Sequence, residues 1–308
     1  MPDAVPNWTR LFPDEDYGFH FGVHRGPARE FFAPTTDTKQ LLDEREHWLN
    51  VQTDRYAGLL PEGRDVVAET VSLLESWQLA SVSAVTPLDQ LIELGQQIEA
   101  DLVLMKPDEA GAFNMVGGCV CFPSSWRLTD KLGLPLTAIH EPVPGLNQSL
   151  GEAIDRFLRT LKPTSAAFRA NWGLSRSPEL NQHPDLERPQ LTPPLNSDEV
   201  FVRIENQALV ALPESGGVLF GIRLENHSAA RTRPTPAGRH RPETRPAHDA
   251  PRSGGLQKPL RFAGGDHQTA RVMERRRNSH EFRYGLFACL LASHCRAFSS
   301  PWTFVRSK

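Results

Sequence analysis

The chain has 308 residues, 39% of them hydrophobic and 23% charged, which is ordinary for a soluble globular protein of one large or two modest domains. The four cysteines form neither a CxxC pair nor a CxxCH motif, so their spacing supports neither a thiolate zinc site nor a covalently attached c-type haem. The N-terminus lacks the basic start and apolar run of a secretory signal, and the longest apolar run of the C-terminal part, Leu286 to Ala292, is too short to span a membrane. We therefore expect a cytoplasmic protein in a reducing compartment.

The net charge of −3 hides a strong asymmetry along the chain. Residues 1–227 carry 18 Lys and Arg against 32 Asp and Glu, whereas residues 228–308 carry 16 against 5. Residues 228–280 are rich in Arg, Pro, Ala, His and Gly without a periodic apolar pattern, so we expect no packed core there. The tail, residues 226–308, is either a disordered basic arm able to contact nucleic acid or a frame-altered end. We favour the second interpretation and expect no nucleic-acid partner.

Helical patterns dominate the first half of the chain. Residues 1–36 are rich in Pro, Phe and turn formers, and predict an irregular arm. Asp37 is a candidate N-cap for a helix that runs to about Leu49, and apolar residues repeat at helical spacing from Arg64 to Leu79. Thr86 followed by Pro87 predicts the start of a third helix.

Strand patterns follow the helices. The first predicted hairpin joins a strand beginning at Asp101 to a strand over Phe113 to Phe122, with a bulge at Gly117 and Gly118. The second joins Val200 to Leu212 with Val218 to Leu224. Helices first and antiparallel hairpins later indicate an α+β fold, and the chain contains neither a Rossmann fingerprint nor a P-loop.

The segment Cys121 to Pro144 concentrates chemistry-bearing residues. Gly133 and Pro135 interrupt its apolar run and leave Leu136 to Ile139 as an extended piece that delivers His140. The prolines that follow cannot continue a helix or a central strand, so we expect His140 at the edge of a rigid element. A structural histidine and a metal ligand both fit this position. After the segment, a capping box that begins at Ser149 predicts an amphipathic helix ending before Pro163.

Two further groups of polar residues have open interpretations. Arg203 and Glu205 share one face of their predicted strand, which indicates a solvated face or a mutual ion pair, or else an anion contact for a cofactor. Ser124 and Ser125 lack the GxSxG motif of a nucleophile elbow, so we expect them to cap a turn.

Three stretches together resemble the haem-dependent oxidative N-demethylase alpha-subunit-like family. They are CFPSSWRLTDKLGLPLTAIHEPVP, then RFLRTL with FRANW, and VRIENQALVALPESGGVLFGIR, in matching order over about residues 37–225. The resemblance implies a PAS-like antiparallel sheet with covering helices, and hence a domain over residues 37–225. It also implies oxygen-dependent N-demethylation of a small secondary amine such as dimethylamine. Electrons would come from NADPH through flavin and iron–sulfur partner subunits.

The same resemblance implies a site for non-covalent haem b. Such a haem needs an axial donor, apolar walls and cations for its propionates. His140 would be the axial iron ligand, Leu134 and Leu136 would supply wall, and the propionates would meet cations, namely Arg127, Lys131 or Arg203. Two alternatives remain open: a haem-binding sensor or carrier without turnover, and a truncated, inactive homologue.

Overall fold

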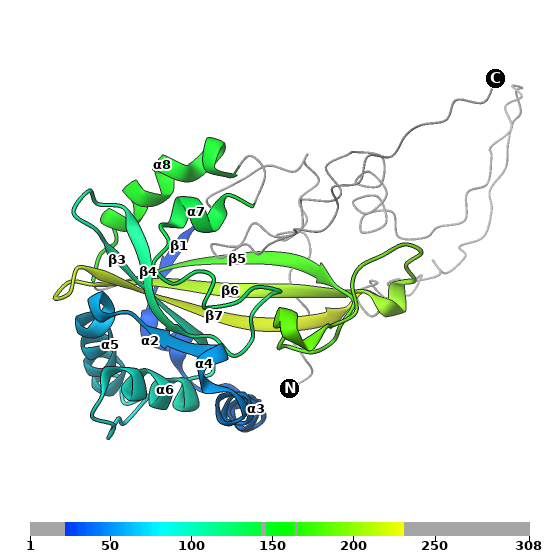
Figure 1. The fold of residues 1–308 in the computed structure, drawn as a ribbon, viewed down its shortest axis with the longest axis horizontal. Coiled ribbons are helices and arrows are strands. Elements are labelled where there is room, and N and C mark those ends of the chain that lie inside the picture. The colour runs from blue at the N-terminus through cyan, green and yellow to red at the C-terminus, as the bar shows by residue number, and fades with distance from the viewer. Residues whose placement is uncertain (1–21, 143–145, 164, 231–308) are drawn as a thin grey trace, which may run out of the picture.

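Seven strands form one antiparallel sheet in the described part of the chain, in the order β1-β5-β6-β7-β3-β4-β2 (Figure 1). The computed structural model describes residues 22–142, 146–163 and 165–230. The strands are β1 (His24–Gly26), β2 (Ala57–Leu59), β3 (Asp101–Pro107), β4 (Phe113–Cys119), β5 (Ala166–Ser175), β6 (Phe201–Leu212) and β7 (Gly217–Ser228).

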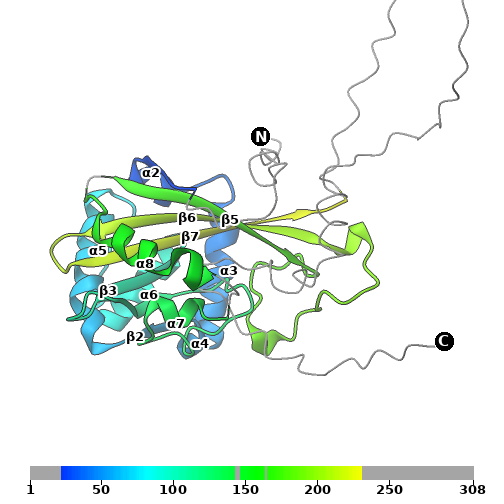
Figure 2. The ribbon, with the colours of Figure 1, turned by 90° about the horizontal axis from the view of Figure 1, so that it is seen from above.

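Helices cover both faces of this sheet (Figures 1 and 2). The helices are α2 (Ala28–Phe32), α3 (Thr38–Val51), α4 (Thr53–Tyr56), α5 (Arg64–Ser76), α6 (Pro87–Gln97), α7 (Leu136–His140) and α8 (Leu146–Arg159), with 3-10 turns η1 (Pro61–Gly63), η2 (Pro184–Leu186) and η3 (Ser197–Glu199). Helices α3, α5 and α6 lie on one face, and α7 and α8 lie on the other. No helix of the described residues is both long enough and apolar enough to cross a membrane.

The two faces of the sheet bury two separate apolar cores. Successive side chains of a strand point to opposite faces, so Ala208 and Val210 of β6 enter the core under α3, α5 and α6, whereas Leu209 enters the core under α7 and α8. In β7, Leu219 likewise enters the core under α3, α5 and α6, and Phe220 enters the core under α7 and α8. The expected fold class, a PAS-like antiparallel sheet with covering helices, is confirmed.

The three predicted helices of the first half and both hairpins are present. Thr86 is the N-cap of α6, and its hydroxyl oxygen accepts a hydrogen bond from the Asp89 amide at 3.2 Å. Helix α5 ends at Ser76 rather than at Leu79, because Gln78 has a left-handed backbone with φ 59°. The bulge between β3 and β4 falls at Val116, which has no partner in the β3–β4 register, immediately before the predicted Gly117.

The expected extended piece at Leu136 to Ile139 is wrong, because these residues begin helix α7. Pro135 holds the extended backbone of an N-cap, and Leu136 and Ile139, three residues apart, then bury the same helix face. Leu134 is 37% exposed, so it does not share a buried wall with Leu136.

Other boundaries also differ from expectation. Helix α8 begins at Leu146, so Ser149 lies inside the helix and is not its N-cap; burial of Leu146 extends the helix beyond the local capping signal. Strand β4 ends at Cys119, not at Phe122, because the chain turns away from β3 there. Strand β5 was not predicted.

Both ends of the described chain join the sheet. Residues 24–32, which we assigned to an irregular arm, form β1 and α2, and β1 pairs with β5. Strand β7 continues to Ser228, past the expected start of the tail at residue 226. The remaining prediction for the tail concerns residues 231–308, which lie outside the described residues.

Candidate functional site

A strip of polar side chains lies buried on the α7 side of β6. Arg203, Glu205 and Gln207 are two residues apart and so face the same side of the sheet, and each is at most 5% exposed. The same face continues with Leu209, which lies in the apolar core under α7 and α8. The expectation of a solvated face at Arg203 and Glu205 is therefore wrong, because the loop that follows β4 covers this end of β6.

Hydrogen bonds join this strip to the loop after β4. The Arg203 guanidinium donates from Nε to the Ser124 hydroxyl and from Nη2 to the Phe122 carbonyl, both at 2.8 Å. The Ser124 hydroxyl donates to Glu205 Oε1 at 2.7 Å, and Gln207 Nε2 donates to Glu205 Oε2 at 3.0 Å. Charged groups are tolerated in such buried places when hydrogen bonds satisfy them.

The loop that carries Ser124 is held from its other side by residues near η2. The Ser125 amide donates to the Gln182 carbonyl, and the Gln182 amide donates to the Pro123 carbonyl, each at 3.1 Å. Ser125 has a positive φ of 63°, which is uncommon for a residue other than glycine. Such strain persists where the surrounding contacts determine the backbone, so this loop is rigidly placed.

Lys131 and His140 are both buried on the same side of the sheet as the strip. Lys131 is 2% exposed and lies between Leu128 and Leu132, which pack into the core under α7 and α8. His140 is 1% exposed and is the last residue of α7. The backbone before α7 is fixed to β4, because Gly133 donates to the Met115 carbonyl at 2.8 Å.

Arg127 occupies a different place, at the surface beside η2. Its side chain is 43% exposed, and its Nε and Nη2 donate to Asp185 Oδ1 at 3.0 and 2.6 Å. The hydrogen bond from Arg127 lowers the pKa of Asp185 from its usual value, and Arg55 contacts the same carboxylate at 3.3 Å. Arg127 thus anchors the loop of η2 rather than joining the hydrogen bonds of Arg203.

His183 is a second buried histidine, in the loop between β5 and η2. It is 2% exposed, and its ring packs edge-on against Tyr56 at 5.6 Å. Burial lowers the pKa of His183 to about 4, so the imidazole is neutral near pH 7. Its Nδ1 accepts the Asp185 amide hydrogen at 3.3 Å, which assigns the ring proton to Nε2. In that tautomer neither ring nitrogen is available to a metal.

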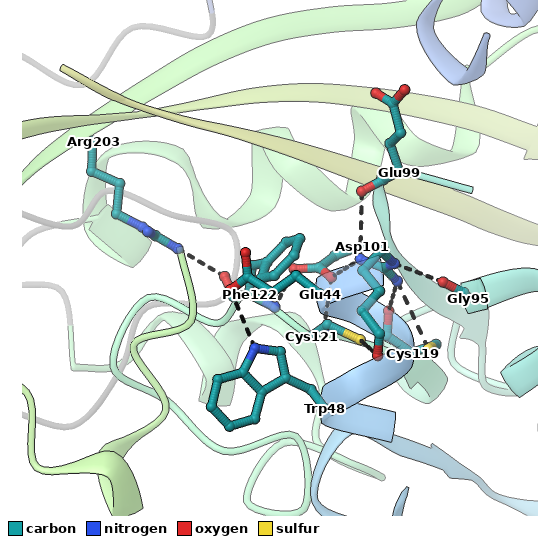
Figure 3. Close-up of polar contacts among 10 residues, drawn as sticks. Glu44, Trp48, Gly95, Glu99, Asp101, Cys119, Cys121, Phe122 and Arg203 are labelled. Atoms are coloured by element: carbon teal, nitrogen blue, oxygen red, sulfur yellow. Dashed lines mark hydrogen bonds and ion pairs between the residues drawn. The ribbon is translucent and has the colours of Figure 1, made fainter. Parts of the chain in front are cut away.

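Sequence reasoning also missed a buried ion pair on the opposite side of the loop, in which Asp101, labelled in Figure 3, takes part. Arg45 of α3 and Asp101 of β3 are at most 1% exposed, and Arg45 Nη1 lies 2.6 Å from Asp101 Oδ1. A signal existed in the sequence, because Arg45 lies on the helix face that Leu41 and Leu49 place toward the core. A charge on an apolar stripe predicts a buried partner.

Within residues 22–230, apart from the undescribed positions, no three His, Cys, Asp or Glu side chains gather as a metal site. A haem needs fewer donors, since the porphyrin supplies four of the iron ligands. One family model matches the chain over residues 53–239, more than half of its length, and is described as haem-dependent oxidative N-demethylase, alpha subunit-like. The match starts later than the resemblance over residues 37–225 and extends past it, and it includes β2 through β7.

Proposed function

Because this chain belongs to the haem-dependent oxidative N-demethylase, alpha subunit-like family, we propose that it binds one non-covalent haem b and demethylates a small secondary amine. An amine such as dimethylamine, molecular oxygen, two electrons and two protons would give methylamine, formaldehyde and water. NADPH would supply the electrons through separate flavin and iron–sulfur subunits, which agrees with an alpha subunit that belongs to a larger assembly.

One observation carries this proposal: His140, Lys131 and Arg203 are each at most 2% exposed. His140 ends α7 and Lys131 lies between Leu128 and Leu132, on the side of the sheet that the Arg203 side chain of β6 faces. Buried ionisable side chains are concentrated at functional sites of proteins. An imidazole, two cations and an apolar core are the donor set that a haem needs. The described residues therefore fit the group.

Each residue would have a distinct role. His140 would ligate the iron, with little rotamer freedom because Leu136 and Ile139 hold α7 in the core. Lys131 and Arg203 would neutralise the propionates, and the apolar core would exclude water from the amine. Arg127 is the third propionate candidate, and it would have to exchange its bond with Asp185 for one with a propionate. The bound haem itself would supply the activation of oxygen.

The first test replaces the proposed axial ligand. Haem titrated into the purified protein should give a Soret band, and His140→Ala should remove or strongly shift this band while the far-ultraviolet dichroism stays near that of the unchanged chain. His183→Asn is the matched control, because it replaces the other buried histidine and should leave the band in place. An unchanged spectrum for His140→Ala would show that the ligand lies elsewhere.

A second test separates catalysis from haem binding alone. The haem-loaded chain, supplied with dimethylamine, oxygen, NADPH and an iron–sulfur reductase system, should release formaldehyde. Haem binding without formaldehyde would favour a sensor or carrier of the same fold. A chain that takes up no haem would be an inactive homologue, and the proposal would then be wrong.

A further inference from the structure

The backbone of Phe122 connects two buried charges on opposite sides of the loop after β4 (Figure 3). Its amide donates to Asp101 Oδ2 at 3.1 Å, and its carbonyl accepts from Arg203 Nη2 at 2.8 Å. Asp101 begins β3, whereas Arg203 lies near the start of β6. One residue therefore links the helix-covered core of α3 and α6 to the polar strip on β6.

On the first side, Asp101 is fixed by several bonds. Its Oδ1 accepts the Cys121 amide at 2.7 Å and the Arg45 guanidinium at 2.6 Å. Arg45 Nε donates in turn to the Gly95 carbonyl of α6 at 2.6 Å, and its guanidinium lies 5.6 Å from the centre of the Phe122 ring. Asp101 thus holds two successive amides of the loop while Arg45 fixes Asp101 to α3 and α6.

On the second side, Arg203 forms hydrogen bonds with the same loop. It bonds to the Phe122 carbonyl and, at 2.8 Å from Nε, to the Ser124 hydroxyl. A guanidinium is planar and presents its donors in a rigid fork, so two acceptors on one loop fix its orientation as well as its place. A displacement of the loop would therefore turn Arg203.

The Arg45–Asp101 pair is not explained by stability alone. Removing two charges from water has a desolvation cost that the attraction within a buried pair often fails to exceed, so such a pair is weak evidence for stabilisation. Burial raises the pKa of Asp101 from its usual value, and the charge of Arg45 and the hydrogen bonds from Arg45, Cys121 and Phe122 act against this rise. Those three donors lie within 3.1 Å of the two carboxylate oxygens, a geometry that suits the ionised form of Asp101.

We propose that Asp101 is a positioning residue for Arg203, acting through the backbone of Phe122, and that it sets the orientation in which Arg203 meets an acidic group of the cofactor. The second half of this statement rests on the proposed function, since it requires a haem propionate beside Arg203. The first half concerns the protein alone. It extends the site from the face of β6 through the loop to α3.

The test measures haem affinity of the full chain with Asp101→Asn and with a matched control. Glu99→Gln is the control, because Glu99 is also a buried carboxylate beside an arginine, Arg223 at 3.3 Å, yet its side chain does not contact the loop. We expect Asp101→Asn to weaken haem binding by roughly tenfold and Glu99→Gln by less than about twofold. Equal weakening by both variants would overturn the proposal.

A double-mutant cycle with Arg203→Gln shows whether Asp101 changes haem affinity through Arg203. If Asp101 acts through Arg203, then Asp101→Asn should change haem affinity by less than about twofold once Arg203 is already replaced. Additive losses would show that Asp101 supports the site in some other way. If Asp101→Asn does not fold, the double variant Arg45→Met with Asp101→Asn removes both charges and avoids an unpaired buried arginine.

A measurement on the haem-free chain tests the positioning role of Asp101 independently of the proposed function. In nuclear magnetic resonance spectra of the haem-free chain, the Arg203 Nε–H signal, assigned by its loss in Arg203→Gln, should exchange with water at least roughly tenfold faster in Asp101→Asn. Glu99→Gln should leave this rate unchanged. Unchanged exchange in Asp101→Asn would refute the positioning role, whether or not the chain binds haem. Altered exchange in a chain that takes up no haem would retain the positioning role and refute the proposed function alone.

Discussion

At the scale of single residues, His183 makes the stability of the fold depend on pH. Burial lowers its pKa from 6.5 to about 4, so between these values the unfolded chain binds a proton that the folded chain does not. Stability should therefore fall as the pH decreases from 6.5 to about 4, by at most about 3 kcal/mol, and this contribution should be absent above pH 6.5. Urea unfolding at a series of pH values measures it.

The same measurement has two useful variants. His183→Asn keeps an oxygen near the place of Nδ1 but cannot titrate, so the slope between pH 4 and 6.5 should become shallower. His47→Asn, at an exposed position of α3, should leave the slope unchanged. A slope that is the same in all three proteins would assign the pH dependence to other groups.

Single residues of the site were predictable only in part. His140 was singled out because an apolar segment precedes it, and Lys131 because the family resemblance implies a cation for a propionate; both are buried. The burial of Arg203 was not predictable, because alternation along a strand assigns a face but does not reveal that a loop from another part of the chain covers it. His183 was missed for the same reason, since its burial depends on Tyr56, which is distant in sequence.

At the scale of elements, helix α6 packs against the end of β4 with a glycine at the contact. An alanine at Gly95 would overlap the Cys119 sulfur and lie close to Arg45 Nη2. Helix propensity favours alanine over glycine by about 1 kcal/mol, but overpacking of a buried contact costs about 1–3 kcal/mol. We expect Gly95→Ala to destabilise the fold, measured as the free energy of unfolding in urea.

Gly151→Ala in α8 is the matched helix control for that prediction. A methyl group there would meet Asn147 at ordinary contact distance, 3.7 Å or more. Propensity should then dominate, so this variant should be neutral or stabilising by up to about 1 kcal/mol. A destabilisation of the same size at both glycines would contradict the steric argument for Gly95.

Elements with their own caps and periodic stripes were predicted from sequence, and elements defined by distant partners were not. Helix α6 was found because Thr86 and Pro87 mark its start. Strand β5 was missed although it pairs with β6 over nine residue pairs, from Ala167 with Leu209 to Ser175 with Phe201, because its own sequence lacks clear alternation. Helix α7 was read as extended because its five residues are too few to show a helical period.

At the scale of the whole molecule, the N-terminal residues are part of the fold that carries the site. Strand β1 adds to the edge of the sheet, and Glu99 accepts hydrogen bonds from Thr35 while it contacts Arg223 of β7 at 3.3 Å. The irregular composition of the first 36 residues did not predict β1, because a three-residue strand is specified by its partner rather than by its own pattern.

Phe32 of α2 tests how strongly this region holds the sheet together. It is 1% exposed, stacks on Trp77 at 6.0 Å, and fills the space that a side chain at Gly221 would need. Phe32→Ala should therefore lower the free energy of unfolding by about 3–5 kcal/mol. Phe31→Ala is the control, since Phe31 is only half-buried and should have a clearly smaller effect. Because β6 and β7 continue from this region to the polar strip, Phe32→Ala should also reduce haem uptake on warming, when the sheet begins to open. Equal and small losses for both variants would mean that the N-terminal region contributes little to the stability of the sheet.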